Sequence, residues 1–283
     1  MKNSDALRLF SDYLKVTGVA HTEPEATNQP ALAGKRLGLL NGSTWVILWA
    51  NYFGRVYLPG VHLVNAGNEA IQINFMQAHA AGLPTPPQVN IDKFVRYALD
   101  LVELAQVDAI LITCSTMNRA YAQVQAALAG RGVPVVQIDR PMMDQAVRQG
   151  GHILVVSTHG PTVESTSQLL HEVAQARHTS VQLSGEIVVD AWQSLARGDV
   201  VRHNELLAQS IRRRQEMEEI DCAVLAQLSM TVFLLSYPDP TKEFGIPIFT
   251  SGQCGYEYVR TLLEGLPPRV QGPAAPITMV EPS

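Results

Sequence analysis

The chain of 283 residues is 46% hydrophobic, 17% charged and 6% aromatic, a composition typical of a globular protein rather than a disordered or fibrous one. Its formal charge of −5 and its scattered Lys and Arg residues do not favour a nucleic-acid or anionic-membrane partner. No apolar run reaches the roughly 18 residues that a membrane-spanning helix needs. The three cysteines show no paired spacing, so we expect a protein of a reducing compartment, the cytoplasm.

Residues 1–33 are predicted to form a short helix followed by a linker. Leu7, Phe10 and Leu14 have helical spacing, and the polar segment after them is punctuated by Pro24 and Pro30. The first 19 residues lack the pattern of a secretory signal. At the other end, residues 267–283 are predicted to be a tail without a core of its own.

Between these ends, short β-branched runs alternate with longer segments of helical periodicity. This alternation predicts an α/β protein with mostly parallel sheets flanked by helices. The predicted strands are 36–41, 61–64, 108–113, 134–138, 152–157, 179–183, 222–227 and 246–250. The predicted helices include 91–106, 117–129, 162–176 and 200–219.

The sequence also contains an internal repeat. Residues 107–117 align without gaps on 220–230, so that Asp108 matches Asp221, and the same offset places Gly132 on Gly245. The strand ending at residues 41–43 matches the one ending at 158–160 with a slightly different offset. These blocks predict two domains related by a pseudo-twofold axis. The first comprises residues 34–138 plus 245–266 and the second residues 139–244.

Parallel sheets bind ligands at the carboxyl ends of their strands, so we expect a cleft between the two domains. Cys114 lies where a strand gives way to a helix, a position that predicts a thiol with a depressed pKa. It could also be one more buried cysteine, although the hydroxyl residues after it favour a functional role. Cys222 is predicted to be core. Cys254 is ambiguous and could be a second acid or base at the cleft.

The segment Ser157-Thr158-His159-Gly160-Pro161-Thr162 predicts a second turn between a strand and a helix. Such a turn can hold a carboxylate or phosphate, or it can simply cap the helix. His159 could be a general acid, a substrate donor or a solvated turn residue. The remaining histidines have no metal-ligand spacing, and no glycine-rich nucleotide motif occurs, so neither a metal site nor a common nucleotide site is expected.

Four motifs in this order resemble the aspartate/glutamate racemase superfamily, which includes hydantoin racemases, maleate isomerase and arylmalonate decarboxylase. They are D-x-x-x-x-x-C-S-T at 108–116, P-V-V-Q-I-D-R-P at 134–141, S-T-H-G-P-T at 157–162 and P-I-F-T-S-G at 247–252. The resemblance spans roughly residues 34–266. It implies a cofactor-independent, metal-free enzyme in which each domain supplies one cysteine, and the two thiols flank the α-carbon of the substrate.

Carried over to this sequence, the resemblance matches Cys114 to the first cysteine. The internal alignment places Gln227 at the position of the second, or Leu228 if it slips by one residue, and neither side chain can be an acid or a base. The residues that we expect to bind substrate are Asn41, Ser43, Ser115, Thr116, Asn118, Thr158, His159, Gly160, Thr162 and Ser229.

The resemblance therefore implies an isomerase that transfers a proton at the α-carbon of a small carboxylate, in a chain that is expected to form a homo-oligomer. With one thiol, ordinary racemisation by two bases is in doubt. A lyase or decarboxylase that acts through the same enolate is the first alternative. A carboxylate-binding relative without catalytic activity is the second. The aromatic residues at 45, 49, 52 and 53 hint at a larger or apolar substrate side chain, although they could equally be core.

Overall fold

The computed structural model describes residues 8–9, 11–15 and 29–267 of the chain. Residues 8–9 and 11–15 are helical, and Lys15 accepts a hydrogen bond from Arg55 through its carbonyl oxygen. Leu7, Phe10, residues 16–28 and most of the predicted tail lie outside the described residues. The predicted amino-terminal helix is thus tested only in part.

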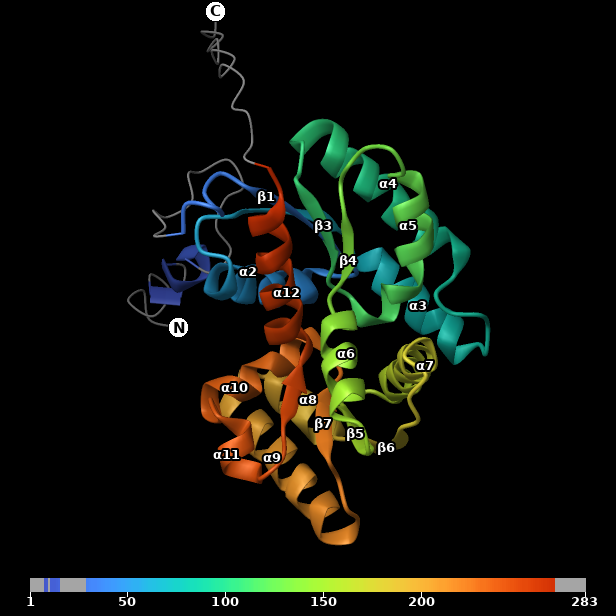
Figure 1. Ribbon diagram of the computed structural model, residues 1–283, viewed down its shortest axis with the longest axis vertical. Helices are drawn as coiled ribbons and strands as arrows, with labels where there is room; N and C mark the ends of the chain where they lie inside the picture. Colours follow the sequence, from blue (N-terminus) through green and yellow to red (C-terminus); the bar gives the residue numbers. More distant parts are fainter. Residues whose placement is uncertain (1–7, 10, 16–28, 268–283) are drawn as a thin grey trace, which may run out of the picture.

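Two four-stranded parallel sheets form the framework, one in each half of the molecule (Figure 1). The strand order of the first sheet is β2-β1-β3-β4 and that of the second is β6-β5-β7-β8. The first contains β1 (Arg36–Asn41), β2 (His62–Gly67), β3 (Ala109–Ile112) and β4 (Val135–Gln137). The second contains β5 (His152–Ser157), β6 (Gln182–Ile187), β7 (Cys222–Leu225) and β8 (Ile248–Thr250). The α/β fold with two related sheets is as predicted.

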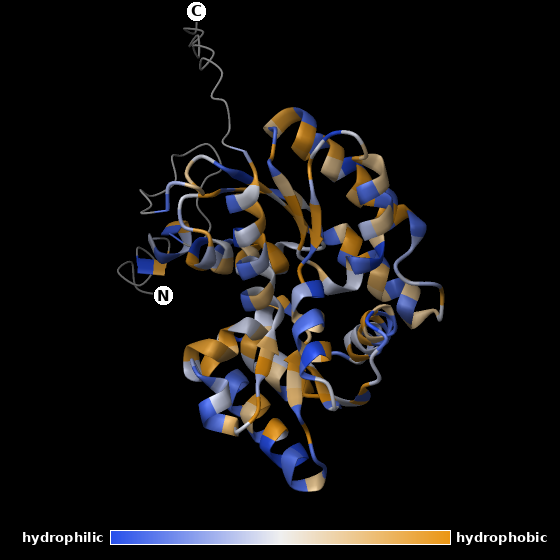
Figure 2. Cartoon of the chain, viewed as in Figure 1, coloured by the Kyte–Doolittle hydropathy of each residue, from blue (hydrophilic) through white to orange (hydrophobic). Residues whose placement is uncertain are grey.

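Each sheet is covered on both faces, which explains why its central strands are continuous apolar runs (Figure 2). The first sheet packs between α2 with α12 on one face and α3, α4 and α5 on the other. These helices are α2 (Thr44–Tyr57), α12 (Ser251–Gly265), α3 (Glu69–Ala80), α4 (Gln88–Ala105) and α5 (Tyr121–Ala127).

The second sheet packs between α6 with α7 on one face and α8, α9, α10 and α11 on the other. These helices are α6 (Arg140–Gln149), α7 (Gly160–Ala176), α8 (Val189–Ala196), α9 (Val200–Met217), α10 (Phe233–Ser236) and α11 (Pro240–Phe244). Two 3-10 helices, η1 (Ser115–Ala120) and η2 (Leu228–Val232), follow β3 and β7 at equivalent places.

The matched aspartates of the repeat make the same contact in both halves. Asp108 Oδ2 accepts a hydrogen bond from the backbone N–H of Arg36 at 2.7 Å, and Asp221 Oδ2 accepts one from that of His152, also at 2.7 Å. Because these bonds lie at the starts of equivalent strands, Arg36 of β1 corresponds to His152 of β5, and Asn41 corresponds to Ser157. The predicted pairing of the ends of these two strands was therefore wrong by one residue.

The edge strands depart most from their predicted bounds. Strands predicted at 61–64 and 179–183 are observed as β2 and β6, which extend further toward the carboxyl end. Both lie at sheet edges and carry polar residues such as Asn65 and Glu186, so their apolar runs are shorter than the strands themselves. The helix predicted over 117–129 is the 3-10 helix η1 followed by α5.

One predicted domain boundary is wrong. Residues 245–250 were assigned to the first domain, but β8 pairs in parallel with β7, with Ile248 opposite Ala223, and thus belongs to the second sheet. The chain returns to the first half only with α12, whose Tyr256 hydroxyl donates a hydrogen bond to the carbonyl of Ala50 in α2 at 2.7 Å. An apolar run does not encode which sheet it will join.

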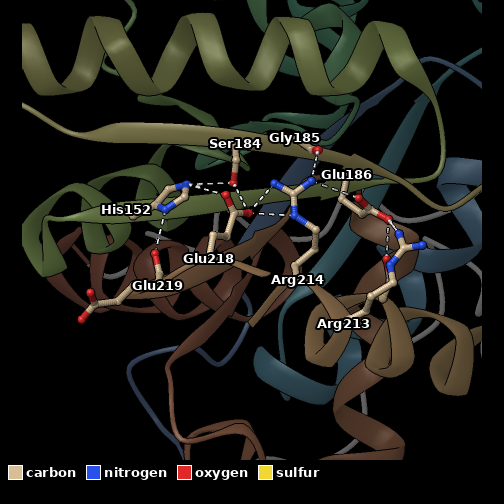
Figure 3. Close-up of polar contacts among 9 residues, drawn as sticks. His152, Ser184, Gly185, Glu186, Arg213, Arg214, Glu218 and Glu219 are labelled. Carbon is tan, nitrogen blue, oxygen red and sulfur yellow. Dashed lines mark hydrogen bonds and ion pairs between the residues drawn. The ribbon is translucent and has the colours of Figure 1, made fainter. Parts of the chain in front are cut away.

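A polar network ties α9 to the edge strand β6 (Figure 3). Arg214 binds both Glu186 and Glu218, and Ser184 donates a hydrogen bond to Glu218 at 3.1 Å. The His152 ring lies between the Ser184 hydroxyl, at 2.8 Å, and the carbonyl of Glu219, at 2.7 Å. None of these residues lines the cavity described next, so the network supports the second half without entering that cavity.

Candidate active site

A cavity of about 350 Å³ lies between the two halves, at the carboxyl ends of the strands. Its volume is within the range of about 300–1,000 Å³ that is common for small-molecule sites. The lining residues come from the segments that follow β1, β2, β3, β5 and β7 and from α8. They are Ser43, Trp45, Val46, Trp49, Glu69, Gln72, Phe75, Met76, Thr113, Cys114, Ser115, Thr116, His159, Pro161, Thr162, Trp192, Gln227, Leu228 and Ser229.

Cys114 directly precedes η1, where the chain leaves β3. Its Sγ lies 3.1 Å from the hydroxyl of Thr116, and its side chain is only 4% exposed. A Cβ atom at Gly42 would lie 2.6 Å from this sulfur, so only a glycine lets the turn after β1 pass so close. The sulfur is therefore held between two strand ends, on the wall of the cavity.

The expected depression of the Cys114 pKa is not observed. Burial raises the pKa of this thiol, and the nearby Asp139 carboxylate raises it further, whereas the Thr116 hydroxyl and the backbone N–H groups of Thr116 and Met117 lower it. Burial dominates because the thiolate loses more hydration in this site than the three donors replace. In the free protein Cys114 is thus a thiol at neutral pH.

Gln227 occupies the equivalent position after β7 and also lines the cavity. Its Oε1 accepts three hydrogen bonds, from the Thr158 backbone N–H at 2.8 Å, the Thr158 hydroxyl at 2.7 Å and the Ser157 hydroxyl at 2.9 Å. A backbone N–H can only donate, so this contact fixes which end of the amide is oxygen. The Nε2 group makes no hydrogen bond within the described part of the chain and remains available as a donor.

The structure brings most of the predicted site residues to the cavity, but not all of them. Lining it are Cys114, Gln227, Ser43, Ser115, Thr116, His159, Thr162 and Ser229. Asn41, Asn118, Thr158 and Gly160 are not among the lining residues. Asn41 accepts a hydrogen bond from Thr113 at 2.7 Å, Asn118 donates one to Asp139 at 2.6 Å, and Thr158 holds Gln227. Asn41, Asn118 and Thr158 thus support the wall through hydrogen bonds rather than line the cavity.

Cys254 does not reach the cavity. It lies in α12 within the apolar cluster that contains Cys222, and it is 3% exposed. Burial raises the pKa of Cys254 to about 12, and the Glu257 carboxylate adds to the rise. The suggestion that Cys254 is a second acid or base at the cleft is therefore wrong, because the helix turns this side chain toward the core.

Sequence reasoning missed part of the aromatic lining. Trp45 and Trp49 lie one turn apart on α2, and Trp192 of α8 joins them from the second half, with its ring centroid 5.2 Å from that of Trp45. The His159 ring packs on Trp192 at 4.9 Å, and burial lowers the pKa of His159, so its ring is neutral at pH 7. Helical spacing could have paired the first two tryptophans, but no sequence signal links residue 192 to them.

Asp139 was also missed. It is 1% exposed and lies between β4 and α6, directly behind the Cys114 turn. Burial raises its pKa to about 6, although the side chains of Ser115, Asn118 and Ser251 act in the opposite direction. A buried carboxyl beside a thiol can tune that thiol without touching a substrate.

Residues 8–9, 11–15 and 29–267 contain no group of three or more His, Cys, Asp or Glu side chains that could hold a metal ion. Within the same ranges, no helix is long and apolar enough to cross a membrane.

Comparison with known families supplies the deciding observation. The family model for Asp/Glu/Hydantoin racemases matches residues 67–259, which include Cys114, Gln227 and the turn at residues 157–162. The chain belongs to this family. The resemblance noted in the sequence is thereby confirmed, at the level of a superfamily of racemases and isomerases. No curated protein sequence matches the chain.

Solved structures of the superfamily share the fold. A glutamate racemase from Francisella tularensis superposes with a TM-score of 0.55 at 14% identity, covering 81% of each chain. An allantoin racemase from Klebsiella pneumoniae gives 0.53 at 16% identity over 81% of this chain and 88% of the other. A maleate isomerase from Pseudomonas putida gives 0.50 at 13% identity, over 81% and 92%. Identities this low establish the fold of this racemase-family chain but not its substrate.

Proposed function

We propose that this member of the racemase family transfers a proton at the α-carbon of a carboxylate, with Cys114 as its one reacting thiol and no cofactor. The observation that carries the proposal is the pair of equivalent positions on the cavity wall. One holds a thiol, at Cys114, and the other holds the amide of Gln227. A thiolate can remove an α-proton, but an amide cannot return one on the other face.

Gln227 then has a different task from that of a second thiol. Its oxygen is engaged by three donors, and its Nε2 group is free to donate toward a bound oxygen. When the α-proton leaves, negative charge moves onto the carboxylate oxygens, and a fixed donor that needs no reorganisation stabilises that charge. Ser229, which is 6% exposed and lines the cavity, offers a hydroxyl on the same side.

Proton transfer is expected on only one face of the substrate α-carbon. Cys114 must lose its proton to act as a base, and the donors of Thr116 and Met117 favour that form. The proton that it removes, or one exchanged with water, returns to the same face of the carbon. Exchange of the α-proton with retained configuration is the expected signature, and rapid equilibration of enantiomers is not.

Decarboxylation is the second candidate, and the raised pKa of Cys114 specifically favours it. When a substituted malonate loses CO₂, the electron pair of the broken C–C bond forms an enolate without any base. The Cys114 thiol then gives its proton to the carbon, and the resulting thiolate is reprotonated by water. This route needs only the one thiol, in the form that the free protein holds.

Proton exchange measured by NMR in D₂O tests the proposal, with a panel of 2-substituted carboxylates, hydantoins and malonates. We expect wild type to incorporate deuterium at the α-carbon and Cys114→Ser to slow this at least 100-fold, as expected for loss of a general acid or base. Cys254→Ala is the matched control, because that thiol lies outside the cavity, and it should keep the wild-type rate.

Two results would contradict the proposal. Turnover that survives Cys114→Ser would remove the thiol from the chemistry. Carboxylate binding without exchange or decarboxylation of any substrate would instead indicate a binding protein without catalytic activity. The homo-oligomeric state and the cytoplasmic location stay predictions.

A further inference from the structure

Building on the proposed function, we propose that the substrate carries an uncharged aromatic group, which packs against an indole wall formed by Trp45, Trp49 and Trp192. All three line the cavity that contains Cys114. They come from both halves, since α2 supplies two and α8 supplies one. A substrate held against the indole wall would contact the thiol turn and both domains at once.

The three indole rings form a continuous surface. The Trp45 centroid lies 5.3 Å from that of Trp49 and 5.2 Å from that of Trp192, with interplanar angles of 75° and 73°. These edge-to-face contacts are the arrangement that aromatic rings prefer. The neutral His159 ring extends the row at 4.9 Å from Trp192. Since His159 directly precedes α7 and follows Thr158, the row leads from the indole wall to the turn that holds Gln227.

The charge of the lining argues against a carboxylate on the side chain of the substrate, the part that would face the indole wall. No Lys or Arg is among the described residues that line the cavity. Its one carboxylate, that of Glu69, accepts hydrogen bonds from the Thr44 N–H at 2.8 Å and the Thr44 hydroxyl at 2.7 Å, and so stays at the start of α2. A side-chain carboxylate, such as that of succinate, would lie near indole rings and Glu69 without a cation to pair with, which is costly in a desolvated site.

A cation enclosed by the indoles is the competing interpretation, because an ammonium group is attracted to tryptophan faces. Rings with centroids 5.2–5.3 Å apart are already in contact with each other, however, so no space for a cation remains between them. The indole wall therefore offers its outer surface to a flat apolar group. Phe75, Met76 and Leu228 add further apolar lining to the same cavity.

Binding can be measured without knowing the reaction. The chain contains three tryptophans, and all of them are in the indole wall, so tryptophan emission, excited selectively over that of tyrosine, reports on this cavity alone. Four probes differ only in the group on the third carbon: propanoate, succinate, 3-phenylpropanoate and 3-(trimethylammonio)propanoate. We expect 3-phenylpropanoate to bind at least tenfold more tightly than the other three and to change the tryptophan emission.

Calorimetry on variants then tests whether the indole wall causes the preference for the phenyl group. Trp192→Ala should reduce the affinity for 3-phenylpropanoate about tenfold and leave that for propanoate nearly unchanged, while Trp192→Phe keeps most of the preference. Tyr258→Ala, which removes an aromatic ring that is 52% exposed on α12, is the matched control and should bind as wild type does. Cys114→Ala should retain the preference, because the ring does not depend on the thiol.

The failures of this inference and of the proposed function are distinguishable. Equal or tighter binding of succinate or of the trimethylammonium probe, or no binding of 3-phenylpropanoate at millimolar concentration, would overturn the aromatic substrate class. So would an unchanged preference in folded Trp192→Ala. Selective binding of the phenyl probe by a chain that exchanges no α-proton supports the aromatic class and refutes only the proposed catalysis.

Discussion

Gln227 shows how one side chain changes what a shared fold can do. In this position its planar amide is held at the oxygen by Thr158 and Ser157, so its conformation is set before any ligand arrives. Such a group contributes a fixed dipole and a donor but no proton. Cys114, across the internal repeat, is left as the residue that must do the proton chemistry, and its burial keeps it protonated in the free protein.

The Gln227→Glu substitution tests the donor role. The new carboxylate would keep an acceptor oxygen for Thr158 but would lose the Nε2 donor and add a negative charge facing a carboxylate ligand. We expect the affinity for 3-phenylpropanoate to fall at least tenfold, or about 1.4 kcal/mol, as measured by calorimetry. The same change at the exposed Gln175 of α7 is the control. Unchanged affinity in folded Gln227→Glu would show that the amide nitrogen does not meet the ligand.

At the scale of elements, the start of α6 fixes the position of the turn that carries Cys114. Asp139 accepts a hydrogen bond from Asn118 of η1 at 2.6 Å, and Ser251 at the start of α12 lies near the same carboxyl group. Gln137 of β4 also donates to the carbonyl of Asn118, at 2.7 Å. The segment that carries Cys114 is thus held in place by contacts from the β4–α6 link and from the start of α12, rather than by its own 3-10 helix alone.

This arrangement predicts a pH dependence of stability. The unfolded chain ionises Asp139 near 3.8 and the folded chain only near 6, so between these values the folded state binds more protons. Rising pH therefore reduces the stability contributed by this group, by about 3 kcal/mol for a pKa rise of this size.

Asp139→Asn cannot ionise and should avoid that loss. The difference in unfolding free energy between variant and wild type should shift in favour of the variant by up to about 3 kcal/mol from pH 4 to pH 7, measured by urea denaturation. Asp190→Asn, at an exposed position of α8, should show no comparable shift. A difference that stays constant with pH would mean that Asp139 titrates normally.

For the whole molecule, α12 joins the two halves. It follows β8 of the second sheet and packs on α2 of the first half, where Tyr256, Val259 and Leu263 are buried in one apolar cluster. The approach is close: a Cβ atom at Gly255 would lie 2.6 Å from Cγ1 and 2.7 Å from the carbonyl oxygen of Ile138. Gly255 therefore lets α12 lie against the link between the sheets.

Gly255→Ala should force α12 away from Ile138. We expect a loss of about 1–3 kcal/mol of unfolding free energy, the usual cost of overpacking a core. Gly265→Ala on the same helix meets no atom within 4 Å and should stay within about 0.5 kcal/mol of wild type. Urea denaturation measures both variants, and equal stability of the two would show that the contact with Ile138 relaxes without cost.

Much of the framework was predictable from local patterns. The central strands are continuous apolar runs because both faces of each sheet are covered, and Asp108 and Asp221 mark the repeat because each bonds to the start of a neighbouring strand. The edge strands were less well predicted, since half-exposed strands mix polar and apolar residues. Cys114 and Gln227 could be paired because a fixed offset between repeats carries strand ends onto strand ends.

The sequence by itself determined the two-sheet fold, the family and the thiol–amide pair, because these depend on short-range periodicity and on the repeat. Only the tertiary structure decided that β8 joins the second sheet, that Trp192 meets Trp45, and that Cys254 faces the core. It also decided the direction of the Cys114 pKa, which is a sum of burial and of contacts from several segments. Such properties arise from residues far apart in the chain, and no local pattern records them.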